Sequence, residues 1–179
     1  MEYWYWKYDR AIDAAQCAEI IAMGNDKWRT GAVSHGGVGD GEIGALRSSD
    51  TVFLDERHIY DLLEPLVVDA NDKAGWRYEL SAAEPLQLTR YNEGEYYGDH
   101  ADSIGSHFDS KPRKLSLSVA LNDDYEGGCF DFCHPVLADE EIATGTVIVF
   151  PSFLFHHVSA VTRGVRYSLV GWYMGPPFK

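Results

Sequence analysis

The spacing of hydrophobic residues changes near residue 75, from helical periodicity to short extended runs. Across residues 55–74 apolar side chains recur three and four positions apart, which predicts an amphipathic helix. Pro65 lies inside this stretch and is expected to kink or restart the helix. Beyond it, short apolar runs alternate with turn residues, so we expect extended segments at 76–80, 85–91, 114–122, 129–133, 145–150, 155–161 and 165–173.

The residues before this helix predict a strand, a helix and a second strand. Residues 2–9 are rich in aromatic side chains and favour an extended first segment. Asp13 can cap a following helix, with Gln16 in the third position of a capping box and Gly24 near its end. Residues 47–54 then have the pattern of a strand.

Helices that precede about eight strands indicate an α+β fold. An antiparallel sandwich or barrel is expected to form the second half of the chain. The 179 residues fit a single domain, 1–179, with room for a core.

Residues 28–45 contain six glycines and favour a long loop over a helix or strand. Such a loop can act as a lid over a substrate. It can equally be the tip of a hairpin, and the sequence favours neither interpretation.

The charge of the chain restricts its partners. Lys and Arg number 15 against 28 Asp and Glu, for a net charge of −13, which argues against nucleic acid and anionic membranes. The acidity suits a neutral or basic substrate, although solubility alone explains it. No apolar run is long enough to span a bilayer, and the N-terminus lacks the features of a signal peptide.

The cysteines favour a cytoplasmic location. Cys17, Cys129 and Cys133 are an odd number, which suits a reducing compartment better than a disulfide framework. Cys129, Cys133 and His134 suggest zinc only weakly, because no second Cys/His pair follows them. We therefore interpret the cysteines as buried free thiols.

The residues that carry chemistry begin with a His-x-Asp pair, His100 and Asp102. On a strand, residues i and i+2 point to the same face, so both side chains can reach one metal ion. His107 and Asp109 repeat the spacing, but in a loop-like Ser/Gly/Lys/Pro-rich stretch. We prefer the first pair because metal ligands are best held on rigid elements.

A later segment, residues 150–166, offers a third ligand and a cation. Two histidines and one carboxylate on one face are the ligand set of a non-haem Fe(II) oxygenase. His156 and His157 face opposite sides of a strand, so only one of them can complete the set. Arg163 and Arg166 likewise compete as the anchor of an anionic co-substrate.

Several ordered blocks of this chain resemble the prolyl 4-hydroxylase-like family of Fe(II)- and 2-oxoglutarate-dependent oxygenases. The resemblance covers much of residues 86–173 and rests on Leu86–Tyr91, Tyr97–Asp102, Leu115–Asp123, Tyr125–Gly128, Phe150–His156 and Gly164–Trp172. It implies a distorted double-stranded β-helix, or jelly roll, with supporting N-terminal helices. It also implies Fe(II), 2-oxoglutarate and O₂ as cofactors and co-substrates, and it allows ascorbate.

The resemblance also assigns roles to residues. It implies that His100, Asp102 and His156 hold the iron and are catalytic, and that Arg166 pairs with the far carboxylate of 2-oxoglutarate. Tyr91 matches a tyrosine that lines the co-substrate pocket. Trp172 matches an aromatic residue near the metal, although core packing explains it as well. His157 and Arg163 are then expected to point outward, Arg163 from a turn.

Two positions depart from the family pattern. Ala120 stands where some relatives have a tyrosine that also contacts the far carboxylate, and Ser118 is on the same face and can replace it. Ala160 stands where the family often has proline, a structural change.

The expected function is hydroxylation of a C–H bond, with release of succinate and CO₂. The resemblance favours a prolyl residue in a peptide or protein as substrate, with a free amino acid or small molecule as the alternative. A different class of interpretation is a non-catalytic jelly-roll protein that binds or senses the metal or 2-oxoglutarate. The intact ligand set and Arg166 argue against it.

Overall fold

The computed structural model describes residues 3–30, 46–103, 111–133 and 142–177. Its helices are α1 (Ala14–Ala22), the 3₁₀ turn η1 (Asn25–Lys27) and α3 (Arg57–Lys73). The capping box is confirmed. The Asp13 side chain accepts a hydrogen bond from the backbone N–H of Gln16, and the Gln16 side chain accepts one from the backbone N–H of Asp13. In the described part of the chain, no helix combines the length and the apolar character needed to cross a bilayer.

The larger of two main sheets has the order β1-β11-β8-β14-β6-β4-β2, with β5 also paired to β14. Its strands are β1 (Trp6–Tyr8), β2 (Arg29–Thr30), β4 (Asp50–Leu54), β5 (Ala82–Ala83), β6 (Leu86–Tyr91), β8 (Arg113–Ala120), β11 (Val147–Pro151) and β14 (Arg166–Met174). The smaller sheet has the order β10-β12-β7-β3. Its strands are β3 (Arg47–Ser48), β7 (Tyr96–His100), β10 (Phe130–Phe132) and β12 (His156–Val158). A separate pair joins β9 (Glu126–Gly127) to β13 (Val161–Arg163), and all pairings are antiparallel.

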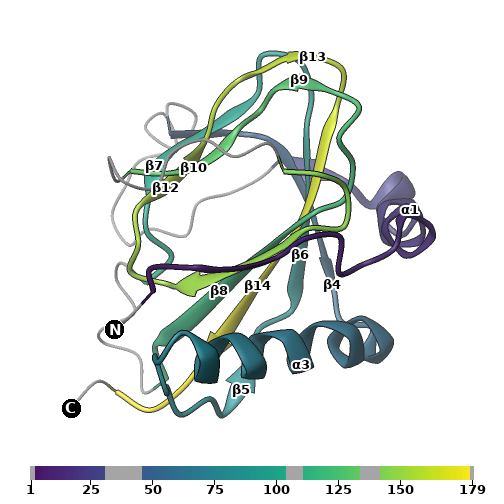
Figure 1. Cartoon of the computed structure of the whole chain (residues 1–179). Helices are drawn as coiled ribbons and strands as arrows, with labels where there is room; N and C mark the ends of the chain where they lie inside the picture. Colours follow the sequence, from purple (N-terminus) through teal and green to yellow (C-terminus); the bar gives the residue numbers. More distant parts are fainter. Residues whose placement is uncertain (1–2, 31–45, 104–110, 134–141, 178–179) are drawn as a thin grey trace.

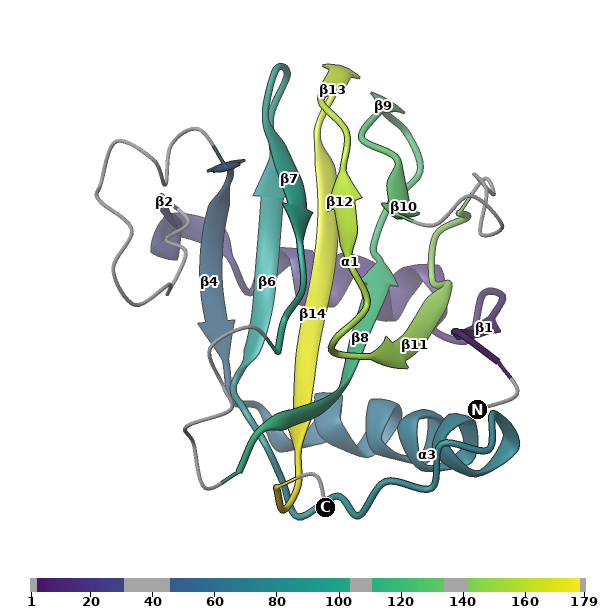
Figure 2. The ribbon, with the colours of Figure 1, turned by 90° about the vertical axis from the view of Figure 1, so that its left-hand side faces the viewer.

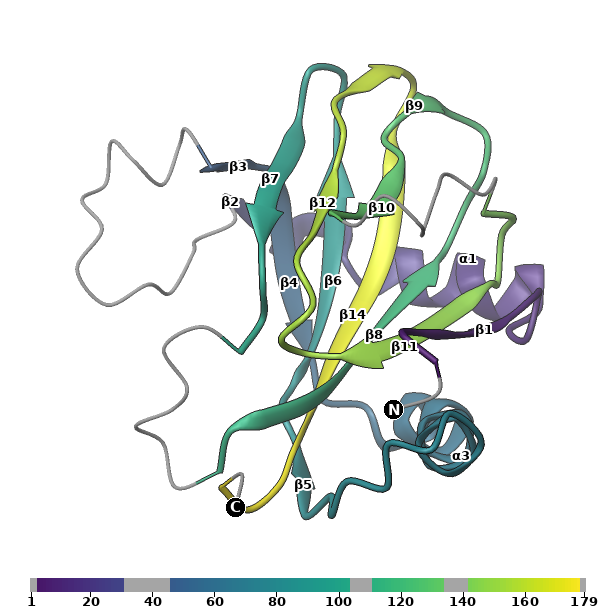
Figure 3. The same ribbon diagram turned by 60° about the vertical axis from the view of Figure 1, so that its left-hand side comes forward.

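The elements form three layers (Figures 1 and 2). Both helices cover one face of the larger sheet, and β7, β12 and β10 of the smaller sheet face its other side. Figure 3 shows these three strands in front of β6, β14 and β8. The space between the two sheets is therefore lined by side chains from both.

The central strands of the larger sheet are apolar on one face and polar on the other. Their helix-facing residues belong to one hydrophobic core with Ile59, Leu63 and Val67 of α3. These strand residues are Leu86, Leu88, Leu115, Leu117, Val119 and Leu169. The alternate positions are also buried, yet many are polar: Gln87, Thr89, Ser116, Ser118, Arg166 and Ser168. Buried polar groups are costly unless they have partners, so this face indicates a site rather than a second core.

Two expectations about elements are wrong, and a third, that Pro65 kinks or restarts its helix, is wrong as to the restart. Residues 76–80 form no strand. The side-chain amide of Asn71 forms hydrogen bonds with the backbone N–H and C=O of Tyr78, which a neighbouring strand would otherwise do. Residues 47–54 divide at Ser49, since Arg47 pairs with β7 whereas Asp50–Leu54 pairs with β6. The helix α3 does not restart at Pro65 but continues through it.

Two further expectations concern single residues and the glycine-rich loop. Cys17 is buried as expected, but Cys129 and Cys133 are exposed, so the interpretation of all three as buried thiols is wrong. The proposed lid over 28–45 falls mostly on residues 31–45, outside the described ranges. The second His-x-Asp pair, His107 and Asp109, and His134 also lie outside them.

Candidate metal centre

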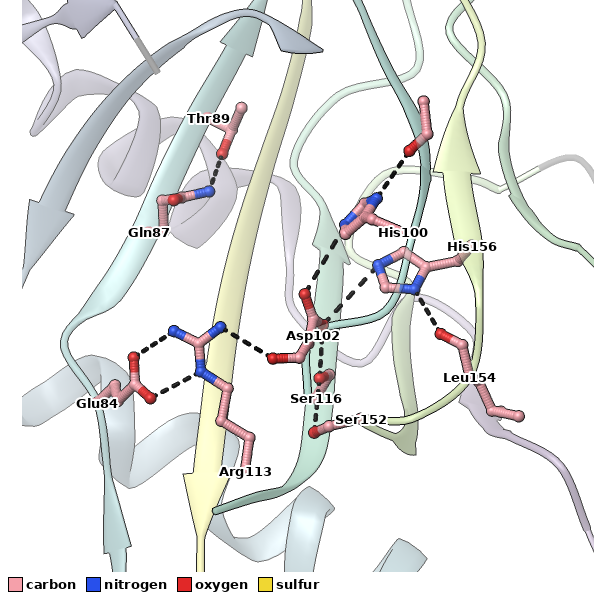
Figure 4. Close-up of polar contacts among 11 residues, drawn as sticks. Glu84, Gln87, Thr89, His100, Asp102, Arg113, Ser116, Ser152, Leu154 and His156 are labelled. Carbon is pink, nitrogen blue, oxygen red and sulfur yellow. Dashed lines mark hydrogen bonds and ion pairs between the residues drawn. The ribbon is translucent and has the colours of Figure 1, made fainter. Parts of the chain in front are cut away.

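His100, Asp102 and His156 converge between the two sheets (Figure 4). The His100 Nε2 atom lies 3.8 Å from Asp102 Oδ1, and His156 Nε2 lies 3.8 Å from Asp102 Oδ2. One ligand atom from each residue lies within 4.8 Å of the others, and all three side chains are at most 7% exposed. The structure therefore brings together the three residues expected as ligands.

Strand pairing and a turn create this convergence. His100 ends β7 and pairs directly with His156, the first residue of β12. Asp102 is not on the strand, as the i, i+2 argument assumed, but in the turn that follows β7. The next residue, Ser103, donates its backbone N–H to Ser152 O at 3.0 Å, which holds this turn near the end of β11.

Both imidazoles present the same nitrogen to the centre. His100 Nδ1 lies 2.8 Å from Gly98 O, and His156 Nδ1 lies 2.9 Å from Leu154 O. A carbonyl oxygen only accepts hydrogen bonds, so each Nδ1 must carry the proton. In the neutral form of each imidazole, Nε2 then carries the lone pair and faces Asp102, which is the arrangement that metal-binding histidines need.

The protonation states also suit a metal. Burial and the neighbouring His156 lower the pKa of His100 to about 4, so its imidazole is neutral at neutral pH. Burial raises the pKa of the Asp102 carboxyl, but His156, His100 and a hydrogen bond from Ser116 outweigh it and hold that pKa below its usual range. His100 therefore offers a neutral nitrogen beside an ionised carboxylate, and two histidines with one carboxylate are a donor set that fits Fe(II).

Arg166 is a buried cation that has no anionic partner within the described ranges. Its side chain is only 3% exposed overall, and its Nη1 donates to Ser168 Oγ at 3.0 Å. The Nε atom is buried and unpartnered, and the guanidinium carbon lies 5.4 Å from the centroid of the buried Tyr91 ring. An unpaired buried charge is costly, so this guanidinium fits an anionic ligand such as a carboxylate.

The alanine noted as a departure has a hydroxyl group opposite it. Ala120 pairs with Ser168 across β8 and β14, and Ser168 contacts Arg166. Ser118, the expected replacement, is buried and pairs instead with Val170. Ser168 was not singled out from the sequence, although it lies two residues after Arg166 on β14 and therefore on the same face of that strand.

Several other residues around the centre were not singled out from the sequence. Ser116 Oγ donates to Asp102 Oδ2 at 2.6 Å and lies 2.9 Å from Ser152 Oγ. Arg113 donates to Glu84 and, at 3.4 Å, to the backbone carbonyl of Asp102. These groups hold the Asp102 carboxylate and its turn in place (Figure 4).

Aromatic rings contact two residues of this region, His100 and Arg113. The Tyr97 ring stacks on His100 with centroids 3.6 Å apart, and the Arg47 guanidinium lies 4.7 Å from the Tyr97 centroid. Arg47 is 5% exposed, and its Nη2 has no partner in the described part of the chain. Trp172 is buried with the Arg113 guanidinium 3.9 Å from its ring centroid, and its indole N–H also lacks a partner among the described residues.

The competing residues lie outside the centre. His157 points away from it, and its Nδ1 atom lies 3.3 Å from Asp99 Oδ1. Arg163 is exposed and pairs with Glu126, as an outward residue should, but it belongs to β13 rather than to a turn.

Comparisons with known proteins agree with this geometry. The model of the 2OG-Fe(II) oxygenase superfamily matches residues 86–174, about half of the chain. The chain belongs to this superfamily. Fe(II) and 2-oxoglutarate are its cofactors, and the prolyl 4-hydroxylase-like resemblance is confirmed.

One curated relative is a PKHD-type hydroxylase of Thermosynechococcus vestitus, 36% identical over 94 residues that cover 49% of this chain and 42% of that protein. The chain spans about two fifths to one half of the curated relatives it matches. The oxygenase fold is also found in a prolyl-4-hydroxylase of Pseudomonas putida, with a TM-score of 0.75 and 17% identity, over 99% of this chain and 94% of that one.

A viral collagen prolyl hydroxylase of Paramecium Bursaria Chlorella virus-1, solved with 2OG, has a TM-score of 0.73 and 20% identity. The alignment covers 97% of each chain. These likenesses confirm the expected jelly-roll fold.

Proposed function

We propose that this chain, as one domain over residues 1–179, is an Fe(II)- and 2-oxoglutarate-dependent dioxygenase that hydroxylates a C–H bond. The observation that carries the proposal is the convergence of His100 Nε2, the Asp102 carboxylate and His156 Nε2. Arg166, which has no anionic partner among the described residues, lies on the buried polar face of the larger sheet that also carries Ser116. Two histidines and a carboxylate leave other coordination positions open for a co-substrate and O₂.

Each residue of the site has a defined part in this proposal. His100, Asp102 and His156 would hold Fe(II), and the bound metal with 2-oxoglutarate supplies oxidation, with release of succinate and CO₂. Arg166 would pair with the far carboxylate of 2-oxoglutarate, assisted by Ser168. Tyr91 would line the same pocket, since its ring lies beside the Arg166 guanidinium.

Burial is the second contribution of the protein. The three ligands and Arg166 are almost inaccessible to water. A dry site strengthens the pairing between Arg166 and a carboxylate and protects reactive species from side reactions.

A prolyl residue in a peptide or protein is the proposed substrate. Support comes from the prolyl hydroxylases among the structural neighbours, two of which are named above. The net charge of −13 favours a neutral or basic peptide. Arg47 is buried beside Tyr97, and its Nη2 has no partner among the described residues, so it offers a hydrogen-bond donor for a substrate carbonyl.

Mass spectrometry after aerobic incubation tests the proposal. The protein is given Fe(II), 2-oxoglutarate and ascorbate, with a panel of prolyl peptides, free proline and other amino acids. We expect a gain of one oxygen on a prolyl peptide and an equal amount of succinate. Oxygen gain only on a free amino acid would reject the peptide substrate and retain the dioxygenase.

Anaerobic absorption separates an enzyme from a binder and from a protein without the site. Fe(II) plus 2-oxoglutarate should give a weak visible charge-transfer band, which Arg166→Gln should weaken by raising the concentration of 2-oxoglutarate required. A band without succinate in air would support the non-catalytic binder. Absence of both would overturn the proposal.

A further inference from the structure

The outer surface of the smaller sheet carries a second group of metal-binding side chains. Asp99 of β7, Cys133 just after β10 and His157 of β12 place one ligand atom each within 4.8 Å of one another. The Cys133 Sγ and His157 Nδ1 atoms are 3.7 Å apart, and His157 Nδ1 lies 3.3 Å from Asp99 Oδ1. None of these residues belongs to the centre described above.

Strand alternation explains why the two groups lie back to back. His100 and His156 point inward, so their sequence neighbours Asp99 and His157 point to the opposite face of the same strands. The third strand is held in register because Cys133 donates its backbone N–H to Phe155 O at 2.9 Å. The outer group is thus built on three paired strands.

The contacts fit a metal better than a nucleophilic triad. In a triad, the acid and the nucleophile contact different nitrogens of the histidine ring. Here Cys133 and Asp99 both approach the same atom, His157 Nδ1. Three donor atoms that face one another in this way can share one cation.

The distances match tetrahedral zinc. Zinc lies at ~2.3 Å from sulfur and ~2.0 Å from nitrogen or oxygen, so tetrahedral angles place S and N about 3.5 Å apart and N and O about 3.3 Å apart. The observed separations are 3.7 Å and 3.3 Å. A thiolate, an imidazole and a carboxylate also suit Zn²⁺ chemically, with water as the fourth ligand.

We propose that Asp99, Cys133 and His157 form a surface Zn²⁺ site that links β7, β10 and β12 on the side opposite the iron centre. The site is accessible, since the side chains of Asp99 and His157 are 69% and 31% exposed and Cys133 is exposed. Binding deprotonates the Cys133 thiol and releases that proton to solvent, so affinity rises with pH. The proposal does not depend on the oxygenase function.

Co²⁺ distinguishes this site from the inner one. Only the outer group has sulfur, so only it can give thiolate-to-cobalt charge-transfer absorption in the near ultraviolet. We expect the band to reach its full intensity at one equivalent of Co²⁺ in His100→Ala, which lacks an inner ligand, and to disappear when Zn²⁺ is added. No band at that stoichiometry would overturn the site.

Single variants test the three ligands. Cys133→Ser should lose the band, while Cys129→Ser, a change at another exposed cysteine, should keep it; the reverse result would reject the assignment. Asp99→Asn and His157→Ala should each weaken Co²⁺ binding by about tenfold or more. Unchanged Co²⁺ affinity in both variants would mean that the Cys133 thiolate binds the metal alone, which contradicts a site of three ligands.

Thermal melting gives a readout that needs no spectrum. Ligand that binds only the folded state stabilises it, so Zn²⁺ at 100 times its dissociation constant should raise the melting temperature of His100→Ala by about 5 °C or more. The double variant with Cys133→Ser should melt at its metal-free temperature, with circular dichroism confirming that it folds. An equal rise in the double variant would contradict the site.

Discussion

At the scale of single residues, His156 and His157 carry the same side chain on opposite faces of β12. His156 is 5% exposed and directs Nε2 to Asp102, whereas His157 lies near Asp99 on the outside. Their difference in role therefore comes from position alone. The sequence predicted that only one could point inward, but its choice of His156 rested on resemblance.

His156→Ala and His157→Ala test this assignment directly. Loss of a ligand should weaken Fe(II) binding by about 100-fold or more, because even the partners that orient a ligand contribute 10–100-fold. The anaerobic charge-transfer band with 2-oxoglutarate, titrated with Fe(II), measures it. His157→Ala should retain near-normal affinity, and loss in that variant alone would show that the two roles are reversed.

Ser116→Ala tests the hydrogen bond that orients Asp102. Without the Ser116 hydroxyl the carboxylate can rotate, so we expect Fe(II) affinity to fall by about tenfold. Ser118→Ala is the matched control, since it is buried on the same strand and face without a contact to a ligand among the described residues. Equal effects of the two substitutions, measured by Fe(II) titration, would argue that only packing is involved.

At the scale of elements, a tight turn next to β9 shapes the pocket around Arg166. Gly128 has a positive φ of 59°, which side chains other than glycine adopt at a cost. A Cβ atom there would lie 3.0 Å from Arg166 Cδ and 3.0 Å from Val161 Cγ2. The glycine thus lets the chain pass closely over the arginine.

Gly128→Ala should impair both stability and co-substrate binding. The left-handed backbone costs about 1–2 kcal/mol for alanine, and the contact displaces Arg166, so KM for 2-oxoglutarate should rise several-fold. Gly94→Ala is the control: its φ is 81°, but nothing lies within 4 Å of the added Cβ. Denaturant unfolding should show a loss in both variants that is larger for Gly128→Ala because of its close contacts, and KM should change only in that variant. A matching rise in Gly94→Ala would refute the contact.

Prediction of helices and strands from the sequence succeeded where a local pattern determines the structure. It failed where a distant side chain or the pairing of strands determines it. The capping box at Asp13 and the strand around Arg166 follow from local patterns, whereas β7, which ends at His100, was not among the predicted extended segments. Residues 76–80 did not form the predicted strand, because Asn71 supplies hydrogen bonds that a strand would need. Ser116 could not be found, since its contact with Asp102 depends on how the turn after β7 lies against β8. Ser168 was overlooked, although strand alternation places it on the same face as Arg166.

At the scale of the whole molecule, the three layers place an apolar core and a polar site on opposite faces of one sheet. The helices pack on the apolar face, which leaves the buried polar face toward the smaller sheet. His100 and Asp102 are part of this interior without metal. Their ionisation therefore contributes to the stability of the entire fold.

The metal-free protein should lose stability as the pH falls from about 6.5 to about 4. In the folded state the pKa of His100 is lowered to about 4 by burial and by His156, whereas in an unfolded chain it is about 6.5. Between these values the unfolded state binds a proton that the folded state does not, so the free energy of unfolding rises with pH. The lowered pKa of Asp102 acts in the same direction at lower pH.

The size of this effect and its origin can be measured together. A difference of about 2.5 pKa units corresponds to about 3 kcal/mol across the window. Denaturant unfolding of metal-free protein at several pH values gives the slope, and His100→Asn should flatten it because asparagine does not titrate. His58→Asn, at a histidine 55% exposed on α3, should leave the slope unchanged. If His100→Asn keeps the full slope instead, the buried imidazole is not its source, and other groups must take up the proton on unfolding.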